Sequence, residues 1–314
     1  MDISVIIVNW RSAAYLQKCL RSLHPALDGL DAEVIVIDNA SFDGSASVTA
    51  ADFPGAIFIQ EENNLGFAGA NNAAARRARG DMLLFLNPDT EVEPDAVRRL
   101  LESLRGWASA AIAGPRVLNG DRTVQTSCVQ SFPTVVNQLL DSEFLRRVWP
   151  SAPFWGTKAL VHESAEASVV EAVAGSCLMI RRSVFEELNG FDTHYFMYGE
   201  DLDLCRRVAR LGSSCLHVPR ARIIHYGGGS SSLVGSGFSI VTMRQAVYRF
   251  MRIHQGAWRA VLYRLSLGFS ALLRIPLAIV TLPFRRGRSL QTMRKWSWIA
   301  LWSVGWTPGY ARRG

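Results

Sequence analysis

Three carboxylates fall within four positions of the chain, in the stretch YFMYGEDLDLCRRVARLG. They are Glu200, Asp201 and Asp203, and they open a predicted helix whose later turns carry arginines. Acids in the first turn and bases in the last complement the helix dipole, worth about 0.3–1 kcal/mol per charge, so a purely structural interpretation stays open. The aromatic residues just before them favour a catalytic one. A carboxylate held against apolar walls has a raised pKa and can act as a general base.

A second candidate site is the turn Asn87-Pro88-Asp89, which ends the apolar run MLLFL. Asn, Pro and Asp are ordinary turn residues, so this motif alone does not establish a site. His225 closes a later strand, just before three glycines. A lone histidine is more often structural than a ligand, but beside Asp89 and a diphosphate its imidazole would complete the shell of a divalent cation. Oxygen donors with one nitrogen donor suit Mg²⁺ or Mn²⁺.

The elements that must position these residues alternate between strands and helices over the first 115 residues. Buried strands are predicted at 3–9, 33–38, 56–60 and 82–87, and helices at 13–23, at 44–51, up to about 79, and at 94–105. This alternation predicts βαβ crossovers and a mostly parallel sheet covered on both faces. Ligands of such sheets bind beyond the carboxyl ends of the strands, which is where Asn9, Asp38, Asn87 and Asp89 fall. The turn after the first strand reads NWRSAAY rather than G-x-G-x-x-G, so a dinucleotide site is excluded.

The second half of the chain is predicted to be less regular. Residues 116–170 lack clear periodicity, and order returns with a strand that runs into a short helix ended by Gly190. After the acidic helix come two short strands, CLHVP and RIIH. We therefore expect three parts: residues 1–115 as one half of the fold, 116–238 as the second half, and 239–314 as a helical tail.

The charge is distributed very unevenly. Residues 1–203 carry 16 Lys and Arg against all 27 Asp and Glu, a balance of −11, whereas residues 204–314 carry 18 Lys and Arg and no acid. This predicts an acidic body with a cationic tail that meets an anionic partner. Tryptophans and apolar runs interleave the arginines of 245–314, which favours an anionic membrane surface over nucleic acid. An interfacial or re-entrant helix is expected at 265–284, with a true span or a helical cap on the body as alternatives.

The five cysteines are scattered and odd in number, which argues against a disulfide framework or a zinc site and favours a reduced cytoplasmic setting. No signal peptide is expected, because a strand-like segment begins directly after Met1.

Five stretches in order carry a resemblance to a known family. They are SVIIVNW, VIVIDNASFDGS, NNLGFAGANNAAARRARGDMLLFLNPDTEVEPDAV, GSCLMIRRSVFEELNGFDTHYFMYGEDLDLCRRVARLG and IIHYGGGS, and together they cover roughly residues 3–232. The chain resembles the family 2 inverting glycosyltransferases of the GT-A fold, most closely the rhamnosyltransferase-like branch that builds bacterial cell-wall and surface polysaccharides. The tail from about residue 240 is outside the resemblance.

The resemblance implies a role for individual residues. NPD stands at the D-x-D position of the family, so Asp89 is implied as a ligand of a divalent cation that bridges the donor diphosphate, and His225 as a second ligand. Asn87 replaces one carboxylate of that motif, which puts strict metal dependence in question. Asp201 is implied as the catalytic base. The remaining implied roles are nucleotide-sugar binding for Asn9, Asp38, Asn64, Gly66, Asn71, Asn87 and Asp89, a catalytic-site role for Glu200, and acceptor-side roles for Asp203 and Tyr198.

These observations together predict an inverting glycosyltransferase at the cytoplasmic face of the bacterial inner membrane, held there peripherally or integrally through its tail. Its leading donor is dTDP-L-rhamnose, and its acceptor is a glycan linked to polyprenyl diphosphate. Another donor, such as UDP-GlcNAc, UDP-galactose or GDP-mannose, is compatible with the same motifs, because the shape of the pocket sets donor choice. A non-catalytic scaffold that binds glycan or nucleotide is the third interpretation, although a scaffold needs no base. No binding of nucleic acid is expected.

Overall fold

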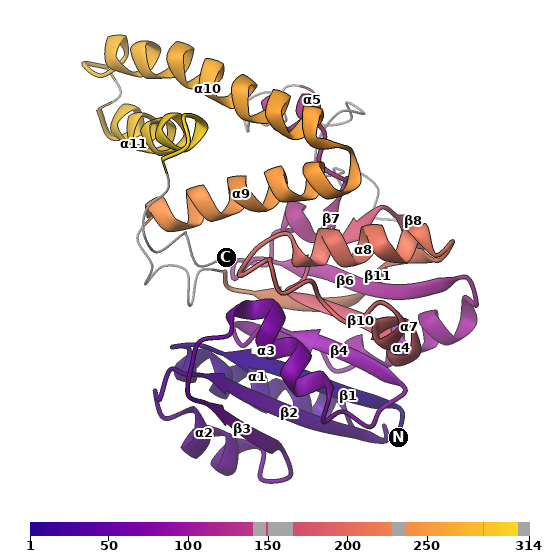
Figure 1. The fold of residues 1–314 in the computed structure, drawn as a ribbon. Coiled ribbons are helices and arrows are strands. Elements are labelled where there is room, and N and C mark those ends of the chain that lie inside the picture. The colour runs from indigo at the N-terminus through magenta and orange to yellow at the C-terminus, as the bar shows by residue number, and fades with distance from the viewer. Residues whose placement is uncertain (141–148, 150–165, 228–235, 285, 307–314) are drawn as a thin grey trace. The chain divides into compact units, whose positions relative to one another are not determined.

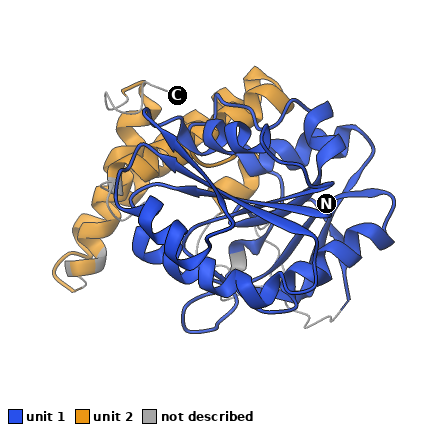
Figure 2. Ribbon diagram, turned by 90° about the horizontal axis from the view of Figure 1, so that it is seen from below, with its two compact units in different colours: residues 1–132, 157–196, 200–230 blue, residues 133–156, 197–199, 231–314 orange. Residues whose placement is uncertain are grey.

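The chain is described from a computed structural model, over residues 1–140, 149, 166–227, 236–284 and 286–306 (Figure 1). It divides into two compact units (Figure 2). The first unit comprises residues 1–132, 157–196 and 200–230, and the second comprises 133–156, 197–199 and 231–314. Parts of the predicted second half and of the predicted tail lie outside the described residues, at 141–148, 150–165, 228–235, 285 and 307–314.

The first unit contains all the described strands and most of the shorter helices. In chain order they are β1 (Ile3–Asn9), α1 (Ala13–Ala26), β2 (Ala32–Asn39), α2 (Ser45–Asp52), β3 (Ile57–Glu61), α3 (Gly66–Ala75), β4 (Met82–Leu86), β5 (Thr90–Val92), α4 (Ala96–Gly106), β6 (Ala110–Leu118), the 3₁₀ helix η1 (Thr126–Cys128), β7 (Val129–Gln130), β8 (Ser168–Val170), β9 (Ala172–Val173), β10 (Cys177–Arg181), α7 (Arg182–Glu187), α8 (Glu200–Arg210) and β11 (Ser214–His225). The second unit contains α5 (Val135–Leu139), α9 (Ser236–His254), α10 (Ala257–Val280) and α11 (Arg286–Ser303).

The central sheet has the strand order β3-β2-β1-β4-β10-β6-β11-β5, with β8 beside β11. Strands β3, β2, β1 and β4 are parallel, as their alternation with helices predicts. Strand β10 is antiparallel to both β4 and β6, and β11 is parallel to β6. The sheet is therefore mixed but mostly parallel, and the carboxyl ends of β1, β2 and β4 share one edge.

The amphipathic helices α1 and α4 cover one face of this sheet. Their buried leucines recur at helical spacing, at 16, 20 and 23 in α1 and at 100, 101 and 104 in α4, and they share one hydrophobic core with Ile3, Val5 and Ile7 of β1. Phe85 packs on the opposite face against Phe185 and Phe191, with ring centroids 5.0 and 4.9 Å apart. Strand β1 is buried along its whole length because both faces are covered.

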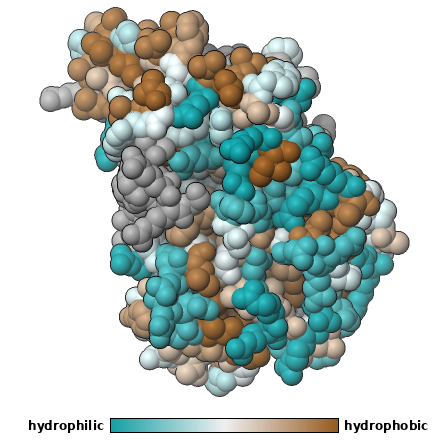
Figure 3. Space-filling model, in the orientation of Figure 1, coloured by the Kyte–Doolittle hydropathy of each residue, from teal (hydrophilic) through white to brown (hydrophobic). Residues whose placement is uncertain are grey.

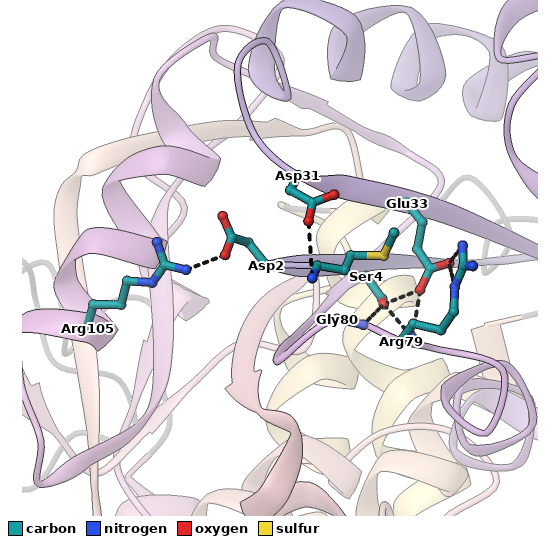
Figure 4. A network of polar contacts seen from close by, with 8 residues as sticks. Asp2, Ser4, Asp31, Glu33, Arg79, Gly80 and Arg105 are labelled. Atoms are coloured by element: carbon teal, nitrogen blue, oxygen red, sulfur yellow. Dashed lines mark hydrogen bonds and ion pairs between the residues drawn. The ribbon is translucent and has the colours of Figure 1, made fainter.

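A polar network ties the amino ends of these strands together (Figure 4). The buried hydroxyl of Ser4 donates to Glu33 at 2.7 Å, and Glu33 also accepts from the backbone and guanidinium of Arg79. The N–H of Gly80 donates to Ser4 at 2.8 Å. This network lies at the edge of the sheet opposite Asn9, Asp38 and Asn87, which follow or end the strands, so we regard it as structural.

Strand β11 differs from the sequence prediction. CLHVP and RIIH were expected as two strands, but they form one strand with a register shift against β6 between Val218 and Arg222. Pro219 has no N–H to donate, so the ladder is interrupted there while the backbone stays extended. This continuity carries the strand on to His225.

The second unit is helical and has its own core. Tyr263 and Leu267 of α10 pack with Met251 of α9 and with Ile299 and Trp302 of α11. Arg264 donates to the Trp302 carbonyl at 2.8 Å, which fixes one face of α10 against α11. The expected helical tail is thus present over the described part of residues 239–314.

Candidate active site

Three polar residues form a row across the ends of the parallel strands. Asn9 pairs in register with Asp38, and Asp38 pairs in register with Gln60 of β3. Asn9 and Asp38 have no exposed surface. The Asn9 amide donates to Asp38 at 2.9 Å and to Asp43 at 3.1 Å. The strand register and the hydrogen bond from Asn9 to Asp38 thus bring together the first two predicted nucleotide-binding residues.

The Asp38 carboxylate also organises the loop that follows its strand. It accepts from the N–H of Phe42 at 2.9 Å and from Gln60 at 2.7 Å, and Ser41 donates to it through both its N–H and its hydroxyl. Burial alone raises the pKa of Asp38, but these hydrogen bonds outweigh it and hold that pKa below the ordinary value. Ala40 and Phe42 have left-handed φ angles of 62° and 51°. Such strain is typical of ligand-binding loops.

The loop before α3 is fastened to the end of β2 by amides. The Asn39 amide donates to Asn64 at 3.0 Å and to the Gly66 carbonyl at 3.2 Å, and its oxygen accepts from the N–H of Leu65 at 2.8 Å. Asn64 in turn accepts from the N–H of Gly66 at 2.9 Å. Asn64 and Gly66 therefore lie together at this strand end, and their role in nucleotide binding stays a prediction. Asn39 was not among the predicted site residues.

Gly66 occupies a position that a side chain would disturb. Its φ is +73°, and a Cβ there would lie 2.6 Å from the Phe196 carbonyl oxygen. The N–H of Phe67 donates to that same carbonyl at 2.8 Å. This glycine lets the loop approach the segment that leads toward α8.

The asparagines of α3 have different roles. Asn71 is buried, and its amide donates to the Phe67 carbonyl at 2.9 Å within the same helix. Its neighbour Asn72 donates to the Phe191 carbonyl at 2.8 Å and accepts from the Phe191 N–H at 2.9 Å. Asn72 thus holds α3 to the segment before α8, whereas Asn71, the residue predicted to flank the nucleotide, bonds inside the helix.

The NPD turn joins β4 to β5 and is closed by Thr90, whose hydroxyl donates to the Asn87 carbonyl at 2.7 Å. Asp89 is nearly buried, and its carbonyl accepts from the N–H of Tyr226 at 3.0 Å. The edge strand β5 pairs Thr90 with His225. This pairing places the end of β11 directly beside the turn.

The side chains of Asp89 and His225 lie beside each other. His225 Nε2 lies 3.3 Å from Asp89 Oδ1 and 3.5 Å from the amide nitrogen of Asn87. A carboxylate oxygen and an imidazole nitrogen are donors that a divalent cation takes. Two protein donors would leave the other coordination positions of such a cation to substrate and solvent. Within the described part of the chain no group of three or more His, Cys, Asp and Glu could hold a metal ion.

The predicted base and its neighbour open α8. Asp201 accepts from the N–H of Gly175 at 2.9 Å and from the N–H of Leu202, the next residue of α8, at 2.8 Å. Burial raises the pKa of Asp201, and these donors offset part of the rise. Burial and the charge of Asp201 together raise the pKa of Glu200 to about 8. Glu200 therefore keeps its proton near neutral pH.

The two predicted acceptor-side residues are placed differently. Asp203 is buried, and Arg207 donates to it at 2.7 Å one turn later while also reaching the Leu188 carbonyl at 2.9 Å. This ion pair fixes α8 against the preceding helix. Tyr198 belongs to the second unit, and its φ of 68° is left-handed. Both acceptor-side roles stay predictions.

Two consecutive residues connect the NPD turn with the base. The N–H of Gly175 donates to Asp201, and the carbonyl of Ser176 accepts from the N–H of Asn87 at 2.9 Å. Strand β10 continues from this point and pairs Cys177 with Leu86 at the end of β4. The segment 175–176 thus holds the NPD turn and the base at a fixed spacing.

Sequence reasoning missed several residues of this site. Asn39, Asp43 and Gln60 complete the hydrogen bonds around the first strand ends. Gln125, from the segment predicted to be irregular, accepts from His225 Nδ1 at 2.9 Å. Asn39 and Gln60 stand at predicted strand ends, which is a usable signal, but no sequence pattern marks Gln125.

Comparison with known proteins identifies the family to which the chain is similar. The model of glycosyl transferase family 2 matches residues 4–188, more than half of the chain. A second model, described as the N-terminal domain of galactosyltransferase, matches residues 161–227. The first match covers the ends of β1, β2 and β4, and the second covers α8 and the segment before it.

Individual relatives and solved structures agree with the family match. The N-acetylglucosaminyl-diphospho-decaprenol L-rhamnosyltransferase of Mycobacterium tuberculosis is 30% identical over 90% of this chain and 94% of its own. Rhamnosyltransferase WbbL of Escherichia coli K12 is 29% identical over 71% of this chain and 82% of its own. The mannosyltransferase PcManGT of Pyrobaculum calidifontis, solved with GDP-Man and Mn²⁺, superimposes with a TM-score of 0.58 at 18% identity over 96% of this chain and 87% of its own. This likeness concerns the fold, and the expected GT-A fold is confirmed.

Proposed function

Because the chain belongs to glycosyl transferase family 2 and is a glycosyltransferase, we propose that it transfers L-rhamnose from dTDP-L-rhamnose to a glycan carried on polyprenyl diphosphate. Two relatives named as rhamnosyltransferases support the sugar, and one of them is named for a diphospho-decaprenol acceptor. The order of motifs along the chain is compatible with this and with other nucleotide sugars.

The observation that carries the proposal is the connection through residues 175–176. It holds a raised-pKa carboxylate, Asp201, at a fixed distance from a turn whose Asp89 and His225 face each other. Transfer with inversion needs a base on one side of the sugar and charge neutralisation at the leaving diphosphate on the other. A binding scaffold has no need for a base held in this way.

In this proposal Asp201 removes the proton from an acceptor hydroxyl. The hydroxyl oxygen attacks the anomeric carbon, the bond from that carbon to the donor phosphate oxygen breaks, and the nucleoside diphosphate leaves with the electron pair. One displacement inverts the anomeric configuration. Glu200 keeps its proton at neutral pH, so it adds no second negative charge beside the base.

On the donor side, the strand-end row supports a nucleotide site. We assign the nucleoside to the edge formed by Asn9, Asp38 and the loop of Asn64 and Gly66. Asn87 and Asp89 then face the diphosphate. Asn71 acts indirectly, by fixing the first turn of α3 through the Phe67 carbonyl.

We assign Asp89 and His225 as the protein ligands of a divalent cation, Mg²⁺ or Mn²⁺. When bound, such a cation supplies positive charge that neutralises the departing diphosphate. Asn87 contributes an amide in place of a second carboxylate. The protein part of the shell thus carries one negative charge, which favours a cation held jointly with the nucleotide.

The second unit supports attachment to an anionic membrane. Helix α10 is the one helix in the described chain that is long and apolar enough to span a bilayer, and only 22% of its apolar window is buried. One of its faces is apolar and exposed, and it includes Leu265, Phe269, Leu272 and Leu273. Figure 3 shows hydrophobic surface gathered over the helices of this unit. The other face of α10 carries Arg264 and Arg274, which pack on tryptophan rings of α11.

This two-sided arrangement favours insertion in the plane of one leaflet. A spanning helix would place Arg274 and its packed face inside hydrocarbon, whereas an interfacial helix buries only the bare apolar face. The absence of acids from residues 204–314 adds attraction to anionic lipids. We therefore propose peripheral attachment at the cytoplasmic face of the inner membrane, where a polyprenyl-linked acceptor is found.

The test is release of nucleoside diphosphate from a panel of sugar nucleotides, with native bacterial membranes as the source of acceptor. The panel contains dTDP-L-rhamnose, UDP-GlcNAc, UDP-galactose and GDP-mannose, with and without chelator, and each is repeated with Asp201→Asn. We expect release from dTDP-L-rhamnose that the variant and the chelator each abolish. Release from another donor would replace the sugar, and unchanged release by Asp201→Asn would remove the base assignment.

A further inference from the structure

His225 can carry its single neutral-state proton on either ring nitrogen, and only one choice suits a cation at Asp89. Nε2 faces Asp89 Oδ1 at 3.3 Å. With the proton on Nε2, the ring donates to the carboxylate and offers no lone pair. With the proton on Nδ1, Nε2 presents a lone pair beside the carboxylate oxygen. The partner of Nδ1 therefore decides which ring form faces the proposed cation site.

That partner is the side-chain oxygen of Gln125, 2.9 Å from Nδ1. An amide oxygen only accepts hydrogen bonds, so Nδ1 must donate and must carry the proton. This conclusion depends on which end of the Gln125 amide faces the ring. The amide nitrogen of Gln125 donates to Asn119 Oδ1 at 3.1 Å, so the amide oxygen of Gln125 is the atom that faces the ring.

The direction of the hydrogen bonds can be followed back to a carboxylate. The Asn119 amide donates to the hydroxyl oxygen of Thr123 at 2.9 Å, and that hydroxyl donates to Asp121 at 2.6 Å. Two hydrogen bonds from Thr123 lower the pKa of Asp121, so its carboxylate is ionised and can only accept. Each donor is thereby fixed in turn from Asp121 to His225, and none of the amides is free to flip.

The backbone around Gln125 holds its side chain in place. Its N–H donates to the Val117 carbonyl of β6 at 2.8 Å, and its carbonyl accepts from Cys128 at 3.1 Å. Residues 119–123 form the intervening turn, in which the N–H of Thr123 also donates to Asp121 at 3.0 Å. The relay is therefore built on a closed turn anchored to the sheet.

We propose that Gln125 is a positioning residue: through the relay Asp121, Thr123, Asn119 and Gln125, the turn holds His225 in the Nδ1-protonated form, so that Nε2 is a ready ligand for a divalent cation beside Asp89. This inference rests on the cation assignment in the proposed function. It extends that assignment to residues that touch neither donor, acceptor nor cation.

The first experiment reads the ring form directly in metal-free protein. Two-bond proton–nitrogen correlation spectra of ¹⁵N-labelled protein at pH 8.5 distinguish the two neutral forms, and loss of signals in His225→Ala assigns the residue. We expect the Nδ1-protonated form in the wild type and in Gln125→Glu, which keeps an acceptor. Gln125→Met, of similar size without an acceptor, is expected to move the population toward the Nε2-protonated form. Tyr226→Phe is the matched control, since its hydroxyl bonds Glu91 and not the ring.

The second experiment measures Mn²⁺ affinity by electron paramagnetic resonance, with and without dTDP or UDP. Partners of this kind typically contribute 10- to 100-fold to metal affinity, so Gln125→Met should bind Mn²⁺ about 10- to 100-fold more weakly, and Gln125→Glu and Tyr226→Phe close to wild type. An Nε2-protonated wild type, or a Gln125→Met variant unchanged in both ring form and affinity, would overturn the inference. A wild type that binds no Mn²⁺ with either nucleotide would overturn the cation assignment itself, a failure visible without any variant.

Discussion

The backbone N–H of Gly175 donates to the Asp201 carboxylate at 2.9 Å, and a Cβ on Gly175 would lie 3.3 Å from the Asp201 Cβ. Because Gly175 has no side chain, its N–H can approach the carboxylate of the proposed base to this distance. Because residue 176 is bonded to the NPD turn, a small displacement here changes the spacing between base and leaving group.

We expect Gly175→Ala to lower kcat about 10-fold or more with little loss of stability. The added methyl pushes Asp201 by a few tenths of an ångström, and catalysis is sensitive to displacements on that scale. Sugar-transfer kinetics and urea unfolding together measure both effects. Gly55→Ala is the control, because nothing lies within 4 Å of its Cβ position. Equal kinetics in both variants would contradict the positioning role.

Glu200→Gln should make the protein more stable at high pH. In the folded state the pKa of Glu200 is raised from its ordinary value of 4.5 to about 8. Between these two pH values the folded state keeps a proton on Glu200 that the unfolded state loses. Wild-type stability therefore falls as the pH rises from about 4.5 toward 8, and the neutral amide avoids this loss.

The measurement is urea unfolding of wild type and Glu200→Gln from pH 4.5 to 8.5. The difference in free energy of unfolding should be small at pH 4.5 and grow in favour of the variant with rising pH, reaching the order of 1 kcal/mol or more. A difference that does not change with pH would show that Glu200 is ionised in the folded protein.

Gly66→Ala should destabilise the protein more than Gly44→Ala. Both glycines have left-handed backbones, with φ of +73° and +90°, but only Gly66 has a carbonyl oxygen 2.6 Å from its Cβ position. The backbone conformation alone costs about 1–2 kcal/mol, and the contact with Phe196 adds to it. Urea unfolding of the two variants separates these contributions. Equal losses would mean that the loop moves away from Phe196 without cost.

Replacing Phe269 and Leu273 by glutamate should release the protein from anionic membranes. These side chains are 63% and 59% exposed, so the fold should tolerate the change. Removing two large apolar groups from the lipid costs about 3 kcal/mol or more, which corresponds to about 100-fold weaker binding. Co-sedimentation with phosphatidylcholine–phosphatidylglycerol vesicles measures it.

The control for this test is Leu211→Glu, which changes an exposed leucine of the first unit. It should bind vesicles like the wild type. If the double variant also binds like the wild type, attachment does not use this face of α10.

The sequence by itself determined the elements of the parallel half and the residue types at its strand ends. Hydrophobic runs such as residues 3–9 and 82–86 are strands because both faces of a parallel sheet are buried, and that constraint is written in consecutive positions. Motif order was enough to identify the family. The residues at the ends of β1 and β2, Asn9 and Asp38, were predictable because parallel strands end at a common edge.

Only the tertiary structure decided which partners orient these residues. The segment after β6 showed no periodicity, yet it forms the closed turn that brings Gln125 to His225, 100 positions apart in the chain. The pairing of β10 with β4 brings residue 176 to Asn87, and a separate hydrogen bond joins Gly175 to Asp201 of α8. Such contacts join residues that are distant in sequence, and each depends on hydrogen-bond direction and strand register. Local patterns of hydrophobicity contain neither.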